Sequence, residues 1–244
     1  MIKNILGRVF AFWAIIVFVP TMLIAFIPIG LAGLWPEPKR TKIFQTSAAI
    51  WMRVFFLFTG TRINAKGKEN FENGKNYIVV CNHNSFMDVP ITTPFIPGPP
   101  NKTIAKVEMA KIPVFGLIYT RGSVLVDRKS EESRKSSFNK MKEVLNLGLH
   151  MCIYPEGTRN KTNEPLQRFH DGAFRLAIDT GKAILPTVIF NTAKVLPVGK
   201  PFFFWPVAIR MHYLEPVPVN STMTVAELRE KVFAIMRDYY VQHK

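Results

Sequence analysis

The chain has 244 residues, enough for one large domain or two small ones with a sizeable core. Lysine and arginine total 32 against 17 aspartate and glutamate, a formal net charge of +15. This excess favours an anionic partner such as a nucleic acid, a membrane surface or a phosphorylated substrate. Cys81 and Cys152 both lie in apolar runs, so we expect buried thiols and neither a disulfide framework nor a metal site.

The N-terminal segment is the strongest compositional feature. No charged side chain occurs between Val9 and Pro36, and this run exceeds the roughly 20 apolar residues that cross a bilayer. Pro20 and Pro28 interrupt it, and a proline inside a helix removes a hydrogen bond and kinks the chain. Basic residues flank both ends, so the charge pattern gives no clear orientation. A bent, re-entrant anchor therefore fits at least as well as a simple span.

A second apolar and aromatic segment covers residues 43–58 and carries one charge, Arg53. We expect it to lie in the membrane interface beside the first segment. The alternative is that both segments are buried helices of a soluble protein. We predict a membrane protein in which residues 1–60 form an anchoring helical pair and the active site faces the cytoplasm.

The composition changes after Gly60, where a polar, turn-rich stretch begins, so we place a soluble domain at residues 61–244. Apolar runs of strand length then alternate with helical patterns, which predicts an α/β domain with a mixed, largely parallel sheet flanked by helices. The predicted strands are residues 77–81, 103–105, 124–126, 151–154, 184–190 and 207–213.

Local signals also place the ends of helices. An amphipathic helix is predicted within residues 131–148. Gly181 is a good stop for the helix before it. Thr224 and Glu227 have the spacing of a capping box, which predicts the start of a C-terminal helix.

The stretch IVVCNHNSFMD, residues 78–88, is apolar until it reaches His83, and Asp88 follows five residues later. Sites in open α/β sheets lie beyond the carboxyl ends of strands. Because Pro90 is tolerated only in the first turn of a helix, residues 83–88 cannot be one continuous helix. A turn lets Asp88 hydrogen-bond one imidazole nitrogen, which leaves the other as a base. Taken alone, this spacing fits a structural turn equally well.

A second stretch, MCIYPEGTRN, has the same pattern of an apolar strand followed directly by polar residues. An apolar strand ends at Pro155 and is followed by Glu156, Gly157, Thr158 and Arg159. Glycine permits close backbone approach, and the forked guanidinium of arginine suits phosphate. If the strands are parallel, this loop and His83 share one rim of the sheet.

Together these stretches resemble the glycerolipid acyltransferase family, whose members acylate lysophosphatidic acid (1-acyl-glycerol-3-phosphate). The resemblance rests on NHNSFMD, AKVEMAKIPVFG, GSVLVDR and YPEGTR, in that order, and on LPTV. The first stretch is similar to the family's His-x4-Asp motif. The resemblance implies that His83 is the general base and that Asp88 orients it. A membrane-embedding helical pair is also similar to bacterial members.

The resemblance implies direct transfer from acyl-CoA or acyl-carrier protein to a lysophospholipid acceptor at the membrane surface, with no cofactor and no metal. Lys106, Arg128 and Arg159 are expected to clamp the acceptor phosphate. Backbone donors around Gly157 are expected to stabilise the oxyanion, and Glu156 to order the loop. The expected substrate-binding set is Lys106, Arg128, Glu156, Gly157, Thr158 and Arg159.

The chain departs from the family pattern at three positions. Residues 169–172 read FHDG where the family has Phe-Lys-x-Gly, so His170 makes any phosphate contact there weaker or pH-dependent. Asn160 and Tyr154 replace a common serine and phenylalanine, and we expect neither to touch the chemistry.

Two other classes of function stay open. An O-acyltransferase acting on a lyso-amino-acid (ornithine-type) lipid or on glycerol 3-phosphate would keep the same His–Asp pair with another acceptor pocket. A non-enzymatic protein that binds anionic lipid would explain the charge and the anchor. Binding of nucleic acid is disfavoured, because many aromatic residues fall in the N-terminal apolar segments.

Overall fold

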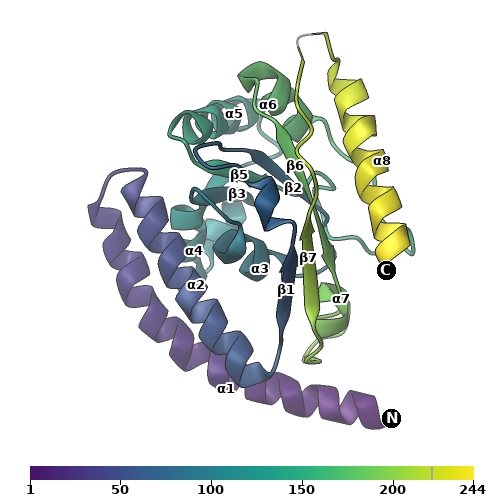
Figure 1. Ribbon diagram of the computed structural model, residues 1–244. Coiled ribbons are helices and arrows are strands. Elements are labelled where there is room, and N and C mark those ends of the chain that lie inside the picture. The colour runs from purple at the N-terminus through teal and green to yellow at the C-terminus, as the bar shows by residue number, and fades with distance from the viewer. Residues whose placement is uncertain (221) are drawn as a thin grey trace.

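A seven-stranded β-sheet forms the centre of the molecule, and helices cover both of its faces (Figure 1). This computed structural model describes residues 1–220 and 222–244. The strands are β1 Ile63–Lys66, β2 Ile78–Cys81, β3 Asn101–Lys106, β4 Ser123–Val126, β5 His150–Ile153, β6 Ile184–Phe190 and β7 Ile209–Tyr213. They lie side by side in the order β1-β7-β6-β2-β5-β3-β4.

The sheet is mixed and largely parallel, which confirms the predicted fold class. β2 pairs in parallel with β5 and β6, and β3 pairs in parallel with β5 and β4. β7 runs antiparallel to β6 and parallel to β1. Because β2 to β5 all point the same way, the loops that follow them emerge at one edge of the sheet. The residues predicted to form the site come from this edge.

The edge strand β1 is absent from the strands that the sequence patterns predict. The sequence patterns indicate only a turn-rich stretch after Gly60, whereas in the structure residues 63–66 pair with β7. Ile63 and Ala65 are half-buried and their neighbours are exposed, the period-two alternation of an edge strand. Two apolar residues are too short a signal to separate a strand from a turn.

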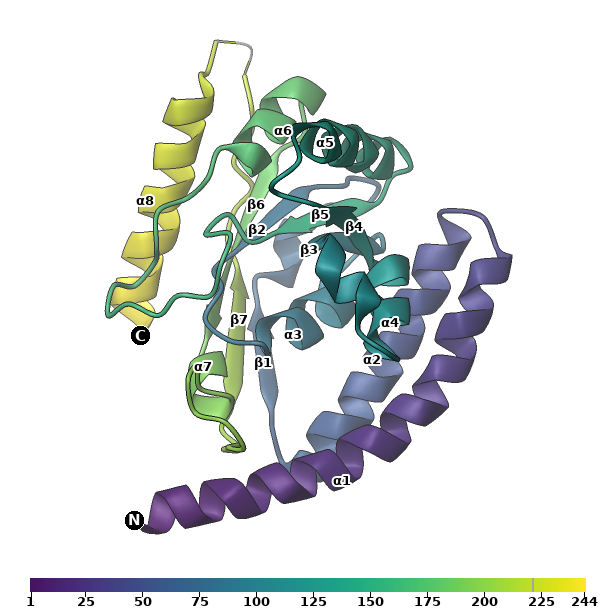
Figure 2. The ribbon, with the colours of Figure 1, turned by 180° about the vertical axis from the view of Figure 1, so that it is seen from behind.

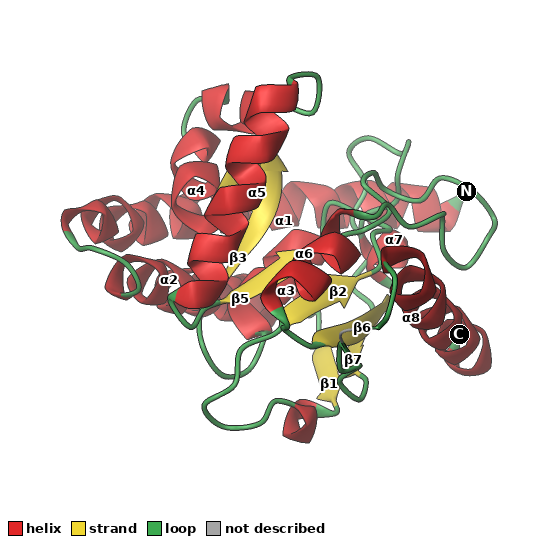
Figure 3. Cartoon of the chain, turned by 90° about the horizontal axis from the view of Figure 1, so that it is seen from above, coloured by secondary structure: helices red, strands yellow, loops and turns green. Residues whose placement is uncertain are grey.

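Two layers of helices enclose the sheet. The helices are α1 Ile2–Leu31, α2 Lys39–Thr59, α3 Asp88–Phe95, α4 Phe115–Gly122, α5 Glu131–Asn146, α6 Gly172–Thr180, α7 Thr192–Val195 and α8 Val225–His243, with 3-10 turns at Ala32–Leu34, Lys68–Asn70 and Val107–Lys111. α5, α6 and α8 pack on one face through their apolar residues, and α2 and α3 pack on the other. Viewed from above, the strands lie between these helices (Figure 3).

The predicted helix ends are confirmed. α6 ends at Thr180, and Gly181 adopts a left-handed conformation with φ of 63°. α8 begins with a complete capping box: the Thr224 hydroxyl accepts from the Glu227 backbone N–H, and the Glu227 carboxylate accepts from the Thr224 backbone N–H. These contacts satisfy backbone donors that the first helical turn leaves without partners.

α1 and α2 form an antiparallel hairpin on the outside of the sheet domain (Figures 1 and 2). α1 continues as a helix through Pro20 and Pro28, and its axis curves along its length (Figure 2). Residues 2–34 are long and apolar enough to cross a membrane, and only 28% of their most apolar window is buried, so α1 is a candidate membrane span. Its outward face carries large exposed apolar side chains: Val9, Phe12, Ile16, Leu23, Ile24, Ile27 and Leu31.

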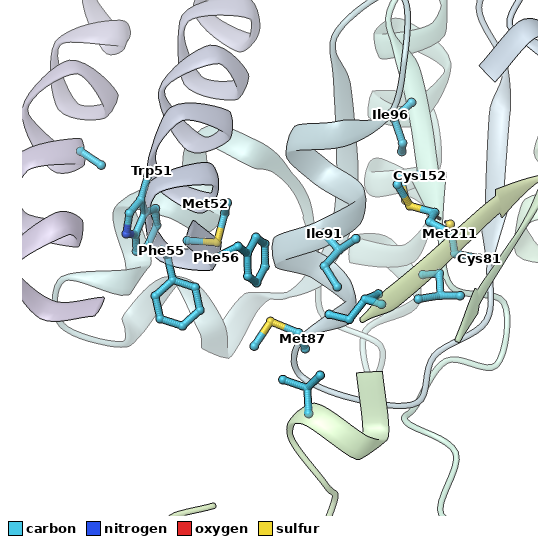
Figure 4. Close-up of a cluster of buried hydrophobic side chains, with 14 of the residues drawn as sticks. Trp51, Met52, Phe55, Phe56, Cys81, Met87, Ile91, Ile96, Cys152 and Met211 are labelled. Atoms are coloured by element: carbon cyan, nitrogen blue, oxygen red, sulfur yellow. Dashed lines mark hydrogen bonds between the residues drawn. The ribbon is translucent and has the colours of Figure 1, made fainter. Parts of the chain in front are cut away.

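The hairpin and the sheet share one apolar core (Figure 4). Trp51 and Phe55 of α2 and Ile91 of α3 belong to the same buried cluster as Cys81 and Cys152 on the sheet. Both cysteines are free thiols, with their sulfur atoms 3.9 Å apart, so the prediction of buried thiols is confirmed. The helical pair is therefore packed against the α/β domain.

Polar contacts also fix the hairpin to β3. Lys102 Nζ lies 2.8 Å from Glu37 Oε1, just before α2 begins. Nearly two turns into α2, Gln45 Oε1 accepts from the Asn101 backbone N–H at 2.7 Å and from its side-chain amide at 3.1 Å. Because these partners are largely buried, losing one of them would leave a polar group without its hydrogen bond, so they hold α2 in one position.

We predict that Thr224→Ala lowers the free energy of unfolding by about 1 kcal/mol, because it leaves the Glu227 N–H without its capping acceptor. The measurement is thermal unfolding of the detergent-solubilised protein. Ser136→Ala, at an exposed position within α5, is the matched control and should leave the midpoint nearly unchanged. Equal midpoints for the wild type and Thr224→Ala would contradict the role of the cap.

Candidate active site

His83 and Asp88 form a hydrogen-bonded pair just beyond β2. His83 Nδ1 lies 2.8 Å from Asp88 Oδ2, and the Asp88 side chain is buried. The same oxygen accepts from the backbone N–H groups of Asn84 at 2.6 Å and Ser85 at 2.8 Å. Because Oδ2 acts as an acceptor in these contacts, Nδ1 carries the ring proton and Nε2 is left as a base. The turn expected between the two residues is present, since α3 begins at Asp88.

Glu156 joins this turn to the loop that follows β5. Its Oε1 accepts from the His83 backbone N–H at 2.7 Å, and its Oε2 accepts from the Gln167 backbone N–H at 3.0 Å. The residue is only 2% exposed. Burial raises the pKa of the Glu156 carboxyl to about 7, and the two backbone hydrogen bonds oppose that rise. Glu156 thus lies beneath the rim and orders both loops.

Gly157 occupies a position that no larger residue would fit. Its φ is 70°, and a Cβ atom there would lie 2.9 Å from His170 Cδ2. Its carbonyl oxygen accepts from Arg128 Nη1 at 2.6 Å. The close backbone approach predicted for this glycine is therefore made by Arg128, which comes from the loop after β4, and by the neighbouring ring of His170.

One cavity of about 890 Å³ connects the rim to the N-terminal hairpin. Six of the eight predicted site residues line it: His83, Lys106, Arg128, Gly157, Thr158 and Arg159. Asp88 and Glu156 lie behind them as hydrogen-bonding supports. Farther in, the lining is apolar and aromatic, with contributions from Phe18, Phe44, Trp51, Phe55, Phe115 and Ile118.

None of the three cations on the cavity wall makes an ion pair within the described part of the chain. Lys106 is the last residue of β3, and Arg128 follows β4 by two residues. Arg159 lies in the loop after β5. Their unneutralised charge lines the same cavity as His83 and suits an anionic group on a bound molecule.

Tyr154 is a site residue that sequence reasoning missed. Its ring centroid is 4.5 Å from that of His83, and its hydroxyl lies 2.6 Å from Thr92 Oγ1. Burial raises the pKa of the Tyr154 phenol well above its ordinary value, so the ring stays neutral beside the imidazole. The sequence did not indicate this contact between the Tyr154 and His83 rings, and the expectation that Tyr154 takes no part in the chemistry stays a prediction. The feature of the sequence that could have indicated this contact is the position of Tyr154, at the end of a predicted strand and directly before Pro155 and Glu156.

The aromatic lining from the hairpin was also missed. The sequence patterns indicate only that Phe18 and Trp51 belong to membrane-directed segments, whereas in the structure both line the cavity. Residues 202–204, three consecutive phenylalanines, complete the wall near α1. Among the described residues, no group of three or more His, Cys, Asp and Glu side chains is arranged to hold a metal ion.

Comparisons with known proteins support the fold and identify the family. Residues 62–190 match the family model described as Acyltransferase, which covers more than half of the chain. The chain belongs to this acyltransferase family.

Among its relatives, the chain is 32% identical over 193 residues to the 1-acyl-sn-glycerol-3-phosphate acyltransferase of Helicobacter pylori (strain J99), covering 78% of this chain and 77% of that one. It is 32% identical over 165 residues to the chloroplastic 1-acyl-sn-glycerol-3-phosphate acyltransferase LPAT1 of Arabidopsis thaliana, covering 67% of this chain. The chain spans only 45% of that plant protein.

The fold is similar to the crystal structure of PlsC, the 1-acyl-sn-glycerophosphate (LPA) acyltransferase of Thermotoga maritima, with a TM-score of 0.79 and 24% identity. The superposition covers 99% of this chain and 96% of the other, so the likeness includes the N-terminal hairpin as well as the sheet.

We predict that Glu156 makes the stability of the protein depend on pH. The folded pKa of about 7 lies above the ordinary value of 4.5, so the folded state binds this proton more tightly than the unfolded chain. The free energy of unfolding should therefore fall as pH rises through this range, by about 3 kcal/mol in total. Glu156→Gln removes the titration, and its unfolding midpoint should change less between about pH 5 and pH 8.

Glu164→Gln, which changes an exposed carboxylate, is the matched control and should keep the pH dependence of the wild type. An unchanged pH dependence in Glu156→Gln would show that another group is responsible.

Proposed function

We propose that this protein transfers a fatty acyl group from acyl-CoA or acyl-carrier protein to the free hydroxyl of 1-acyl-glycerol-3-phosphate. The product is phosphatidic acid, an intermediate of phospholipid biosynthesis. The observation that carries the proposal is the single cavity in which the His83–Asp88 pair, three cations and an apolar channel come together. The names of the relatives support the same reaction.

The chemical step needs only a base, a hydroxyl and a thioester. His83 Nε2 takes the proton of the acceptor hydroxyl while that oxygen attacks the thioester carbonyl carbon. As the tetrahedral intermediate collapses, the ester forms, the carbon–sulfur bond breaks, and the leaving thiolate takes the proton back from His83. Asp88 holds the ring tautomer and stabilises the imidazolium. We propose that no metal or organic cofactor takes part.

The cations on the wall bind the acceptor phosphate in this proposal. Lys106, Arg128 and Arg159 line the cavity together with His83, so a phosphate held by them places the acceptor hydroxyl near Nε2. Such positioning removes much of the entropic cost of bringing the reactants together. Backbone donors near Gly157 and Thr158 would then stabilise the oxyanion.

The apolar channel receives an acyl chain, and the exposed apolar face of α1 lies in the membrane. Because α1 and α2 form part of the channel wall, the site lies where a membrane-bound lysophospholipid arrives. We propose that the active site faces the cytoplasm, where acyl-CoA and acyl-carrier protein are available, and that nucleic acid is not a partner.

A second candidate acceptor is a lyso-amino-acid (ornithine-type) lipid or glycerol 3-phosphate. The observation that favours it is the ring of His170 beside Gly157, at a position where the family pattern that this sequence resembles has a lysine. Histidine in place of lysine there weakens the preference for a phosphate and would suit an acceptor with a different head group.

We predict that membranes containing the wild type form phosphatidic acid from lysophosphatidic acid and acyl-CoA, and that His83→Ala lowers the rate by about 10²–10⁴. His243→Ala, which changes an exposed histidine of α8, is the matched control. The measurement is the rate of product formation, run in parallel with a lyso-ornithine lipid as the acceptor.

Turnover of only the amino-acid lipid would overturn the proposed acceptor but retain the His83 mechanism. Equal rates for the wild type and His83→Ala on both acceptors would overturn the mechanism.

We predict that filling the channel shortens the preferred acyl chain. Ala48 of α2 lines the cavity and is buried, and Ala48→Leu adds a larger side chain there. The kcat/KM for long acyl chains should fall relative to that for shorter ones by about tenfold or more. Ala193→Leu, at an exposed position of α7, is the control. An unchanged chain-length profile in Ala48→Leu would place the acyl chain elsewhere.

A further inference from the structure

Phe86 has a large apolar side chain that the fold does not bury. It is 60% exposed, although Ser85, Met87 and Asp88 beside it in the same turn are all buried. The turn itself is held by other residues: the Ser85 hydroxyl donates to the Leu196 carbonyl, and the Met87 N–H donates to that hydroxyl. Phe86 therefore contributes little to the core, and its ring is available for another purpose.

The ring of Phe86 lies against Arg159. The distance from Arg159 Cζ to the centre of the ring is 3.5 Å, which is the separation of a guanidinium and an aromatic ring in contact. Within residues 1–220 and 222–244, the Arg159 guanidinium makes no hydrogen bond and no ion pair. Phe86 is therefore the partner that orients this side chain.

Arg128, unlike Arg159, is held through the N–H edge of its guanidinium. One of its N–H groups donates to the Gly157 carbonyl, so part of its hydrogen-bonding edge is already used. A guanidinium has five N–H donors, and all of them lie in its plane. A ring that contacts the guanidinium through its face leaves these donors free, whereas a carboxylate partner would occupy them and also neutralise the charge.

We propose that Phe86 is a positioning residue that supports the face of Arg159, so that the whole N–H edge of the guanidinium binds the phosphate of the acceptor. This inference rests on the proposed function. The ring belongs to the turn that carries both His83 and Asp88, and the Asn160 backbone N–H donates to the His83 carbonyl at 2.7 Å. The base and the phosphate-binding arginine are therefore held at a fixed separation by one short structure.

An exposed aromatic ring could also contact the bilayer. Substitutions at position 86 distinguish a bilayer contact from support of Arg159. Leucine at position 86 keeps an apolar side chain of similar reach but has no π-face to support a cation. Tyrosine and tryptophan keep that face. A lipid contact or a merely structural role would therefore tolerate Phe86→Leu, whereas support of Arg159 requires the aromatic ring.

The experiment measures steady-state acylation of lysophosphatidic acid in mixed micelles by the wild type, Phe86→Leu, Phe86→Tyr and Phe86→Trp. For Phe86→Leu we expect the KM for the acceptor to rise about 3- to 30-fold. The kcat and the KM for acyl-CoA should change less than twofold, roughly, because the His83–Asp88 pair is untouched. Phe86→Tyr and Phe86→Trp should restore the wild-type KM.

Arg159→Lys provides the second test, because a lysine ammonium lacks the planar fork that the ring supports. In that background Phe86→Leu should raise the acceptor KM much less than it does in the wild type. Equal acceptor KM values for the wild type and Phe86→Leu would overturn this inference alone. A wild type that does not acylate any phosphate-bearing acceptor would overturn it together with the proposed function.

Discussion

Glu156 Oε1 accepts the backbone N–H of His83 at 2.7 Å, and this hydrogen bond joins the loop after β2 to the loop after β5. The parallel pairing of these strands brings the two loops to the same edge of the sheet, but pairing alone does not fix how they face each other. The Glu156 carboxyl fixes how they face each other, because it accepts a hydrogen bond from the backbone of each loop, and its burial raises its pKa to about 7. This contact holds His83 next to the loop that carries Gly157 and Arg159.

Part of the net charge of +15 is concentrated at the rim of the sheet, where the cations that line the cavity lie. Elsewhere several cations have carboxylate partners, such as Lys102 with Glu37 and Arg229 with Asp171. The cations that line the cavity have none among the described residues. A low-dielectric wall beside such charges strengthens their field, so the charge excess acts at a defined place as well as over the surface.

The fold class and most of the catalytic rim could be predicted from the sequence, because each motif follows a strand whose apolar run is easily recognised. His83 and the loop from Glu156 to Arg159 follow such strands, whereas Arg128 was expected only from the resemblance to the acyltransferase family. Four features could not be predicted from the sequence. β1 carries too few apolar residues, and the contacts of Tyr154 with His83 and of Phe86 with Arg159 depend on how separate loops pack. The role of the hairpin in lining the cavity was hidden because an apolar helix has the same composition whether it faces lipid or a substrate.

The N-terminal hairpin therefore has an outer side that is exposed and an inner side that lines the cavity. Outward residues such as Ile24 are exposed and apolar, whereas inward residues such as Trp51 and Phe55 line the channel. A fragment beginning at residue 61 would keep the His–Asp pair but lose one wall of its channel, and water would fill the space. Deleting the hairpin to obtain a more soluble protein would thus remove part of the cavity wall, so the apolar outer face and the cavity lining would be lost together.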